Sequence, residues 1–146
     1  MVTHDRRRGN TYDAAGVQEK FGVPPAAIPD LLALVGDDAD GIPGIPGWGM
    51  KTAAAVLREY GSIEAIPNDA AHWTVKVRGA ERLTTTLSAH RDDARLYKRL
   101  ATLRTDVPLS ESLNDLEWRG VKRDAYGALC KECGFGDLAQ RPTRWR

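Results

Sequence analysis

Residues 36–54 read GDDADGIPGIPGWGMKTAA, and this stretch decides the fold that we expect for the chain. Three acidic residues within four positions are followed by a run of glycines and prolines that is too dense for a regular helix or strand. The stretch then becomes alanine-rich and helical, with Lys51 near the start of the helix. We therefore expect a tight hairpin that opens a helix, with carboxylates immediately beside it.

The hairpin has the features of an anion-binding corner. Gly47 and Gly49 permit backbone conformations and a close approach that a Cβ atom would prevent. The first turn of the next helix has unpaired N–H groups and the positive end of the helix dipole, and Lys51 adds a full charge. A DNA phosphate could therefore bind against these amides. The alternative is a plain corner between two helices without a ligand, and the hairpin residues alone leave both interpretations open.

Helical patterns extend outward on both sides of the hairpin. Asp13 is expected to cap a helix over residues 14–21 that ends at Gly22, and Pro29 suits the first turn of an apolar helix that runs to Val35. Further segments are expected to be a helix over 50–60, a turn capped by Ser62, two helices that meet near His90, and a last helix over 121–134. The pattern predicts an all-α fold.

Composition sets broad limits on the protein. A length of 146 residues with 42% hydrophobic and 28% charged residues is ordinary for one compact globular domain. No run of about 18 apolar residues occurs, and no apolar stretch follows the basic start to make a secretory signal. We expect a soluble, cytoplasmic protein.

The sequence CKEC places Cys130 and Cys133 at the spacing of half a zinc site or of a redox pair. No second cysteine pair completes four ligands, and the three histidines lie far away in the sequence. We favour two reduced thiols on a buried or half-buried helix face.

Charge is distributed unevenly although the net charge is only +1. Residues 72–104 hold eight basic and three acidic side chains, whereas residues 1–46 hold four basic and seven acidic ones. A basic block of this kind indicates either a nucleic-acid surface or a solvated helix face.

The longer stretch GDDADGIPGIPGWGMKTAAAVLREYGSIEAI resembles the helix-three-turn-helix region of the 5'-nuclease family. That family comprises the 5'-3' exonuclease domain of bacterial DNA polymerase I, its free-standing relatives and the flap endonucleases. Four features coincide in order: a Gly-Asp-x-x-Asp pair, an Ile-Pro-Gly hairpin, a Gly-x-Gly-x-Lys-Thr-Ala helix start and a Tyr-Gly-Ser-Ile-Glu turn. The resemblance runs from about Tyr12 through ATLRTDVPL and into the last helix, and it implies a compact helical SAM-like domain with a helix-hairpin-helix DNA-binding motif.

The resemblance explains why carboxylates stand beside the hairpin. It implies that Asp37 and Asp40 belong to a nuclease centre that uses Mg²⁺ or Mn²⁺, metals that prefer oxygen ligands. Asp38 lies between them and is expected to be solvated or to cap the turn. Gly41 stands where the family often has asparagine, so no side-chain role is expected there. The family hairpin is also associated with a monovalent cation, so backbone carbonyls of residues 41–47 are expected to be able to hold K⁺.

The resemblance also implies which residues meet DNA. VKVRGAERL resembles the family's second small hairpin, further along the duplex. The implied DNA-binding residues are Gly44, Gly47, Gly49, Lys51, Thr52, Lys76, Arg78 and Arg82. Trp48 and Trp73 are expected to pack in the protein, because the family grips duplex backbone rather than splayed bases.

The family's catalytic α/β half has no counterpart in this sequence. Residues 1–12 resemble only a remnant of the exit from that domain, and residues 13–146 resemble the C-terminal helical DNA-binding domain. We expect binding of double-stranded or 5'-flap DNA without efficient cleavage by this chain, which would be a fragment, a split gene product or a degenerate copy. The alternatives are a nuclease subunit that is active only with a separate catalytic chain, and a helix-hairpin-helix domain that binds protein.

Overall fold

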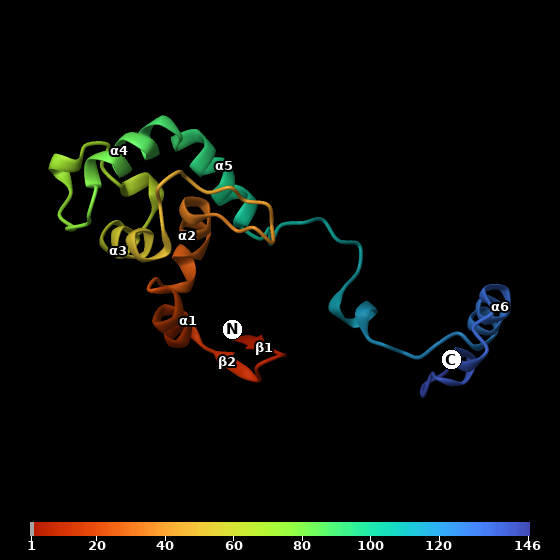
Figure 1. The fold of residues 1–146 in the computed structure, drawn as a ribbon. Coiled ribbons are helices and arrows are strands. Elements are labelled where there is room, and N and C mark those ends of the chain that lie inside the picture. Colours follow the sequence, from red (N-terminus) through yellow and green to blue (C-terminus); the bar gives the residue numbers. More distant parts are fainter. Residues whose placement is uncertain (1) are drawn as a thin grey trace. The chain divides into compact units, whose positions relative to one another are not determined.

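A computed structural model describes residues 2–146 and shows a mostly helical chain with one pair of short strands (Figure 1). The all-α class expected from the sequence is confirmed. The chain divides into two compact units, Met1–Arg104 and Thr105–Arg146. Every residue from 102 to 119 is exposed, so the segment around this boundary contributes no buried side chain to either unit. Each unit is therefore described by itself.

The first unit begins with two antiparallel strands, β1 (Thr3–Asp5) and β2 (Asn10–Tyr12). Helix α1 (Ala14–Phe21) follows, and its predicted cap is confirmed, since the Asp13 carboxylate accepts a hydrogen bond of 2.9 Å from the Gly16 N–H. The helix ends at Gly22, whose φ of 75° is the left-handed conformation that glycine adopts without strain.

Four further helices complete the first unit: α2 (Ile28–Val35), α3 (Met50–Tyr60), α4 (Ala80–Ala89) and α5 (Arg91–Ala101). Short 3₁₀ turns lie at Pro25–Ala27, Ile63–Ala65 and Ala70–His72. Helix α2 contacts both α3 and α5 and carries the centre of the core. The largest fully buried side chains are Leu31, Leu34, Leu57, Ile63, Leu87, Val23 and Val56. This core fixes the directions of α3 and α4, the two helices that begin at glycine-bearing loops.

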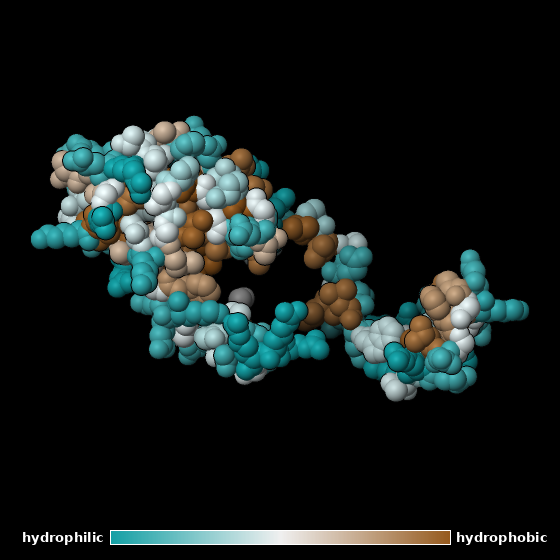
Figure 2. All heavy atoms as spheres, viewed as in Figure 1, coloured by the Kyte–Doolittle hydropathy of each residue, from teal (hydrophilic) through white to brown (hydrophobic). Residues whose placement is uncertain are grey.

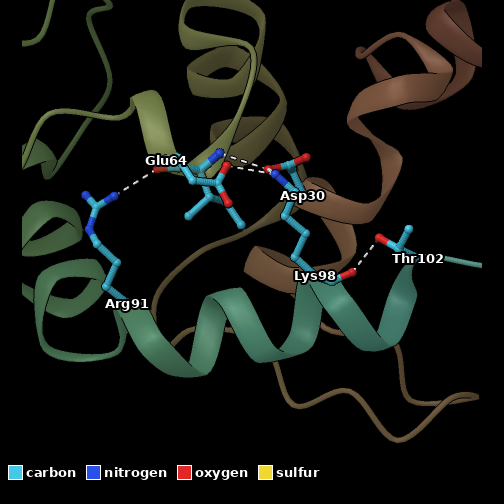
Figure 3. Close-up of polar contacts among 6 residues, drawn as sticks. Asp30, Glu64, Arg91, Lys98 and Thr102 are labelled. Carbon is cyan, nitrogen blue, oxygen red and sulfur yellow. Dashed lines mark hydrogen bonds and ion pairs between the residues drawn. The ribbon is translucent and has the colours of Figure 1, made fainter.

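An ionic cluster ties the turn after α3 to α2 and α5 (Figure 3). The buried Asp30 carboxylate accepts hydrogen bonds of 2.9 Å from the Ile63 N–H and from Lys98 Nζ, and Lys98 also pairs with Glu64 at 2.7 Å. Ser62 occupies the N-cap position of this turn, as predicted, but its side chain makes no capping bond, and Asp30 accepts from the first amide of the turn instead.

Arg91 reinforces the same region from the start of α5. Its guanidinium donates to the carbonyl oxygens of Ile63 and Ile66, both at 2.9 Å. Arg91 and Lys98 are therefore committed to internal contacts, and Arg95 pairs with Asp92 at 2.7 Å. The basic block of residues 72–104 is thus only partly available to a ligand.

The second unit contains two 3₁₀ turns, Leu113–Leu116 and Asp137–Gln140, and helix α6 (Arg123–Cys133). The chain end returns to this helix, where the Tyr126 and Trp145 rings lie 5.9 Å apart and the Arg123 guanidinium lies 4.4 Å from the Trp145 ring. Cys130 is buried and Cys133 is exposed, so only the first thiol is on the buried face expected from the sequence.

Exposed apolar side chains mark the segment that follows α5, seen in brown in Figure 2. They include Leu103, Val107, Leu109, Leu113 and Leu116. Among residues 2–146, no helix has the length and apolar character that crossing a membrane requires.

Candidate nucleic-acid interface

The acidic turn after α2 is closed by backbone contacts. Asp37 and Ile42 exchange two backbone hydrogen bonds of 2.8 and 2.9 Å. Gly36 and Gly44 have φ values of 92° and 73°, and a Cβ atom on Gly44 would lie 2.5 Å from the backbone of Val35 and Gly36. Gly44 is buried, and its lack of a side chain lets two backbone segments touch and so shapes the hairpin.

The tip of the glycine hairpin, residues 44–49, is exposed on the side that leads into α3. Gly47 and Gly49 are both exposed. Gly47 has a φ of 86°, whereas Gly49 has an extended φ of −110° and nothing within 4 Å of the position of a Cβ atom. Helix α3 begins directly after Gly49 and has no side-chain cap. No side chain therefore accepts a hydrogen bond from the first N–H groups of α3, and these groups border open space.

The second predicted hairpin also places a glycine directly before a helix, here α4. Gly79 has a φ of 77° and precedes α4, which also lacks a side-chain cap. Lys76, Arg78 and Arg82 are exposed, and no ion pair or hydrogen bond of their side chains is present in the described part of the chain. The Arg82 guanidinium reaches across to the first hairpin, since its Nη2 lies 3.5 Å from the Cβ position of Gly47.

The two hairpins meet at an open hollow of about 530 Å³, which we name the hairpin hollow. It is lined by Gly47, Thr52, Arg78, Gly79, Arg82 and Leu83. The lining contains two arginines and no carboxylate, and it receives the N-terminal turns of two helices. Unpaired amides, helix dipoles and guanidinium groups favour an anion such as a phosphate.

The sequence-predicted residues are thus brought together only in part. Gly47, Thr52, Arg78 and Arg82 share the hairpin hollow, whereas Lys51 lines a different hollow on the other side of α3. Lys76 is exposed but outside the lining. Gly79 was missed as a site residue, although Arg-Gly-Ala-Glu at a helix start repeats the glycine signal of the first hairpin.

Asp37 and Asp40 lie on the same turn beside the hairpin. Asp37 is half-buried and its Oδ1 accepts a hydrogen bond of 3.0 Å from the Ala39 N–H, while Asp40 and Asp38 are exposed. Within residues 2–146, no group of three or more His, Cys, Asp or Glu side chains is placed to hold a metal ion.

The two tryptophans pack as expected. Trp48 belongs to the hairpin and is buried in the core, and its ring centroid lies 6.1 Å from that of the half-buried Trp73. Trp73 Nε1 donates to the Pro67 carbonyl at 3.0 Å. Neither ring is presented as an open stacking platform.

Comparison with known proteins identifies related domains. Residues 23–124 match the family model described as "5'-3' exonuclease, C-terminal SAM fold". The chain is 40% identical over 130 residues to DNA polymerase I of Bacillus caldotenax, covering 89% of this chain and 14% of that protein. It is 42% identical over 138 residues to DNA polymerase I of Rhizobium leguminosarum, covering 94% of this chain and 13% of that protein. The thermostable DNA polymerase I of Thermus filiformis is 39% identical over 130 residues, covering 89% of this chain and 15% of that protein.

The chain therefore spans only 13–15% of the length of these relatives. The family match covers the hairpin, both glycine-led helix starts and the ionic cluster that supports them. On these grounds the chain belongs to the family of 5'-3' exonuclease C-terminal domains with the SAM fold.

Proposed function

We propose that the chain binds duplex or 5'-flap DNA through its phosphates, without reading sequence, as the C-terminal part of a 5'-3' exonuclease or flap endonuclease. The observation that carries this proposal is the hairpin hollow, where the starts of α3 and α4 and two unpaired arginines face one space. The family relationship, which supports a nuclease-associated DNA-binding domain, agrees with it.

The hollow would hold phosphates mainly through backbone donors. Amides at the start of α3 and beyond Gly79 would donate to phosphate oxygens, and Arg78 and Arg82 would add charge-assisted hydrogen bonds. Contacts of this kind fix the position and orientation of a duplex but carry no base information. Binding would therefore be sequence-independent.

We propose that Asp37 and Asp40 supply carboxylate oxygens to a Mg²⁺ or Mn²⁺ centre that a separate catalytic domain completes. The residues fit such a metal, because both are oxygen donors on an accessible turn beside the hairpin. When bound, the metal would act as a Lewis acid on the scissile phosphate. The contribution of this chain would be to hold the duplex while the turn presents its carboxylates.

A monovalent cation such as K⁺ at the hairpin is the second cofactor we propose. The ion would use backbone carbonyls of residues 41–47, including those of Ile42 and Ile45, because a carbonyl that accepts one hydrogen bond keeps a second lone pair. DNA affinity measured in potassium and in lithium salts of equal concentration tests this, and equal affinities would contradict it.

The salt dependence of binding tests the main proposal. With about three to five phosphates neutralised, log K should fall with log[salt] at a slope of roughly −3 to −4.5. Replacing Arg78 and Arg82 by glutamine should make that slope less steep by about 1.8, because each phosphate contact contributes about 0.9. Anisotropy titrations at several salt concentrations measure both values. A flat dependence, or no binding at low salt, would refute DNA binding through phosphates.

A further inference from the structure

A second basic hollow lies between the end of α1 and the start of α3, and we name it the α1–α3 hollow. Its volume is about 410 Å³. Apolar atoms of Phe21, Met50 and Ala54 line it together with the cations Lys20, Lys51 and Arg58. No carboxylate contributes to the lining. Three cations around one concave surface create a positive potential that attracts anions.

The three cations are not neutralised by nearby acidic groups. None of the three has an ion pair within the part of the chain that the structure describes. Glu59 is the sequence neighbour of Arg58, and its carboxylate accepts a hydrogen bond from the Thr74 hydroxyl and forms no ion pair with Arg58 within the described residues. The charge of the hollow is therefore available to a ligand.

Contacts within the fold hold two of these cations at the edge of the hollow. Lys20 Nζ lies 4.6 Å from the Tyr12 ring centroid and 5.0 Å from that of Phe21. Arg58 Nη2 lies 3.5 Å from the Cβ position of Gly22, beside the C-terminal end of α1. The partial negative charge at that helix end stabilises the guanidinium there. Because Lys20 covers the Phe21 ring, the hollow offers charge rather than a stacking surface for a base.

The two hollows lie on different sides of the first turn of α3. Thr52 lines the hairpin hollow and Lys51 lines the α1–α3 hollow, and consecutive helical residues point about 100° apart. An anion in the second hollow would therefore be separate from one held by Arg78 and Arg82.

We propose that the α1–α3 hollow binds phosphodiester phosphates of a nucleic-acid strand, in addition to those held at the hairpin hollow. This inference rests on the proposed function, because it extends a DNA-binding surface around α3. The phosphates have two candidate sources, namely the duplex itself and an unpaired strand that leaves it.

The test compares Lys20→Gln/Arg58→Gln with a control that removes the same charges elsewhere, Arg99→Gln/Lys131→Gln, both at exposed positions. The probes are a short blunt duplex and the same duplex with a single-stranded 5' thymidine extension, titrated by anisotropy against the full chain. On the extended probe, Lys20→Gln/Arg58→Gln should lose about tenfold in affinity. Its salt slope should become less steep by about 1.4, because two contacts to single-strand phosphates contribute about 0.7 each. The control should change affinity by less than about twofold, as screened surface charges do.

The two probes separate the sources of the phosphates. A loss confined to the extended probe assigns the hollow to the unpaired strand, and an equal loss on both probes assigns it to the duplex. Affinities that match the control on both probes overturn the inference, provided that circular dichroism shows the variant folded. Failure of the unaltered chain to bind either probe would instead refute the proposed function, and this inference with it. Wild-type binding that is lost with Arg78→Gln/Arg82→Gln but not with Lys20→Gln/Arg58→Gln would refute the second hollow alone.

Discussion

Gly47 and Gly49 lie at the same hairpin tip for different physical reasons. The φ of 86° at Gly47 is one that L-residues rarely adopt, so substitution there strains the backbone itself. At Gly49 the backbone is extended and a Cβ atom would meet open space. A side chain at Gly49 should therefore leave the fold intact and affect only a ligand that approaches the amides of α3.

We predict that Gly49→Val weakens DNA binding more than Lys51→Ala does. The valine side chain would occupy the space through which a phosphate reaches the helix start, at a cost of about tenfold in affinity, or about 1.4 kcal/mol. Loss of Lys51 removes one screened charge and should cost about threefold. Anisotropy titration of both variants measures the difference, with circular dichroism as the folding control. A larger loss for Lys51→Ala would contradict binding by the backbone.

At the scale of elements, the Asp30–Lys98–Glu64 cluster keeps the turn after α3 attached to α2 and α5. Burial lowers the pKa of Lys98. The hydrogen bonds to Glu64 and Asp30 outweigh burial, so the pKa lies above its ordinary value. Burial raises the pKa of Glu64, and the hydrogen bond from Lys98 with smaller contributions lowers it overall. Both shifts favour the charged pair in the folded state.

Asp30→Ala should lower the free energy of unfolding by about 3 kcal/mol. The substitution leaves the Ile63 amide without its acceptor and the partly buried Lys98 without its buried carboxylate partner. Urea unfolding followed by tryptophan fluorescence measures the change. Asp38→Ala removes an exposed carboxylate and should cost less than about 0.5 kcal/mol. Equal effects of the two substitutions would show that the cluster does not hold these elements together.

The contribution of Glu64 to stability should depend on pH. Its pKa in the folded state lies below the ordinary value of 4.5, so the stabilisation is present above 4.5 and is lost as pH falls through the lower folded value. The raised pKa of Lys98 implies that its own contribution is present below 10.5 and is lost as pH rises through the folded value. Glu64→Gln should therefore destabilise the protein at pH 7 but not in strong acid.

The size of this effect is limited by solvent. The Glu64 side chain is 47% exposed, so the difference at neutral pH should be at most about 1 kcal/mol. Thermal unfolding of the two proteins at several pH values measures it, and Glu19→Gln, at an exposed position on α1, serves as the control. A difference that persists unchanged into strong acid would assign the effect to packing rather than to the ion pair.

At the scale of the whole molecule, the chain corresponds to a small part of its relatives, and its acidic turn offers two candidate metal ligands beside the hairpin. In-line displacement at a phosphate needs fixed geometry and usually two metals about 4 Å apart. We predict that this chain with Mg²⁺ or Mn²⁺ cleaves a 5'-flap substrate negligibly. Fused to a catalytic 5'-nuclease domain, it should support cleavage that depends on Asp37 and Asp40.

The matched variant is Asp37→Asn/Asp40→Asn. In the unfused chain it should leave DNA affinity unchanged or slightly higher, because it removes negative charge near the phosphates. In the fused enzyme it should remove most of the cleavage activity. Cleavage and binding assays on the same preparations separate the two effects. Robust cutting by the 146-residue chain that disappears in the variant would show a complete active site here.

Local chemistry made much of the fold predictable from the sequence. The start of α1 and the ends of α1 and α3 depend on Asp13, Gly22 and Gly61, whose conformations and hydrogen bonds involve residues only a few positions away. The order of acidic turn, glycine hairpin and helix identified the family for the same reason, since the whole pattern lies within residues 36–54. The sequence by itself therefore determined the helices, the hairpin and the candidate carboxylates.

Only the tertiary structure decided how the charges are used. Arg82 faces Gly47 across the hairpin hollow, and Arg91 turns inward to carbonyls 25 and 28 positions away in the sequence. Gly44 is buried against the end of α2, whereas Gly47 is exposed, although each of them ends an Ile-Pro-Gly tripeptide. Composition assigns every basic residue the same charge, whereas burial and long-range packing determine which of them remain available to a phosphate.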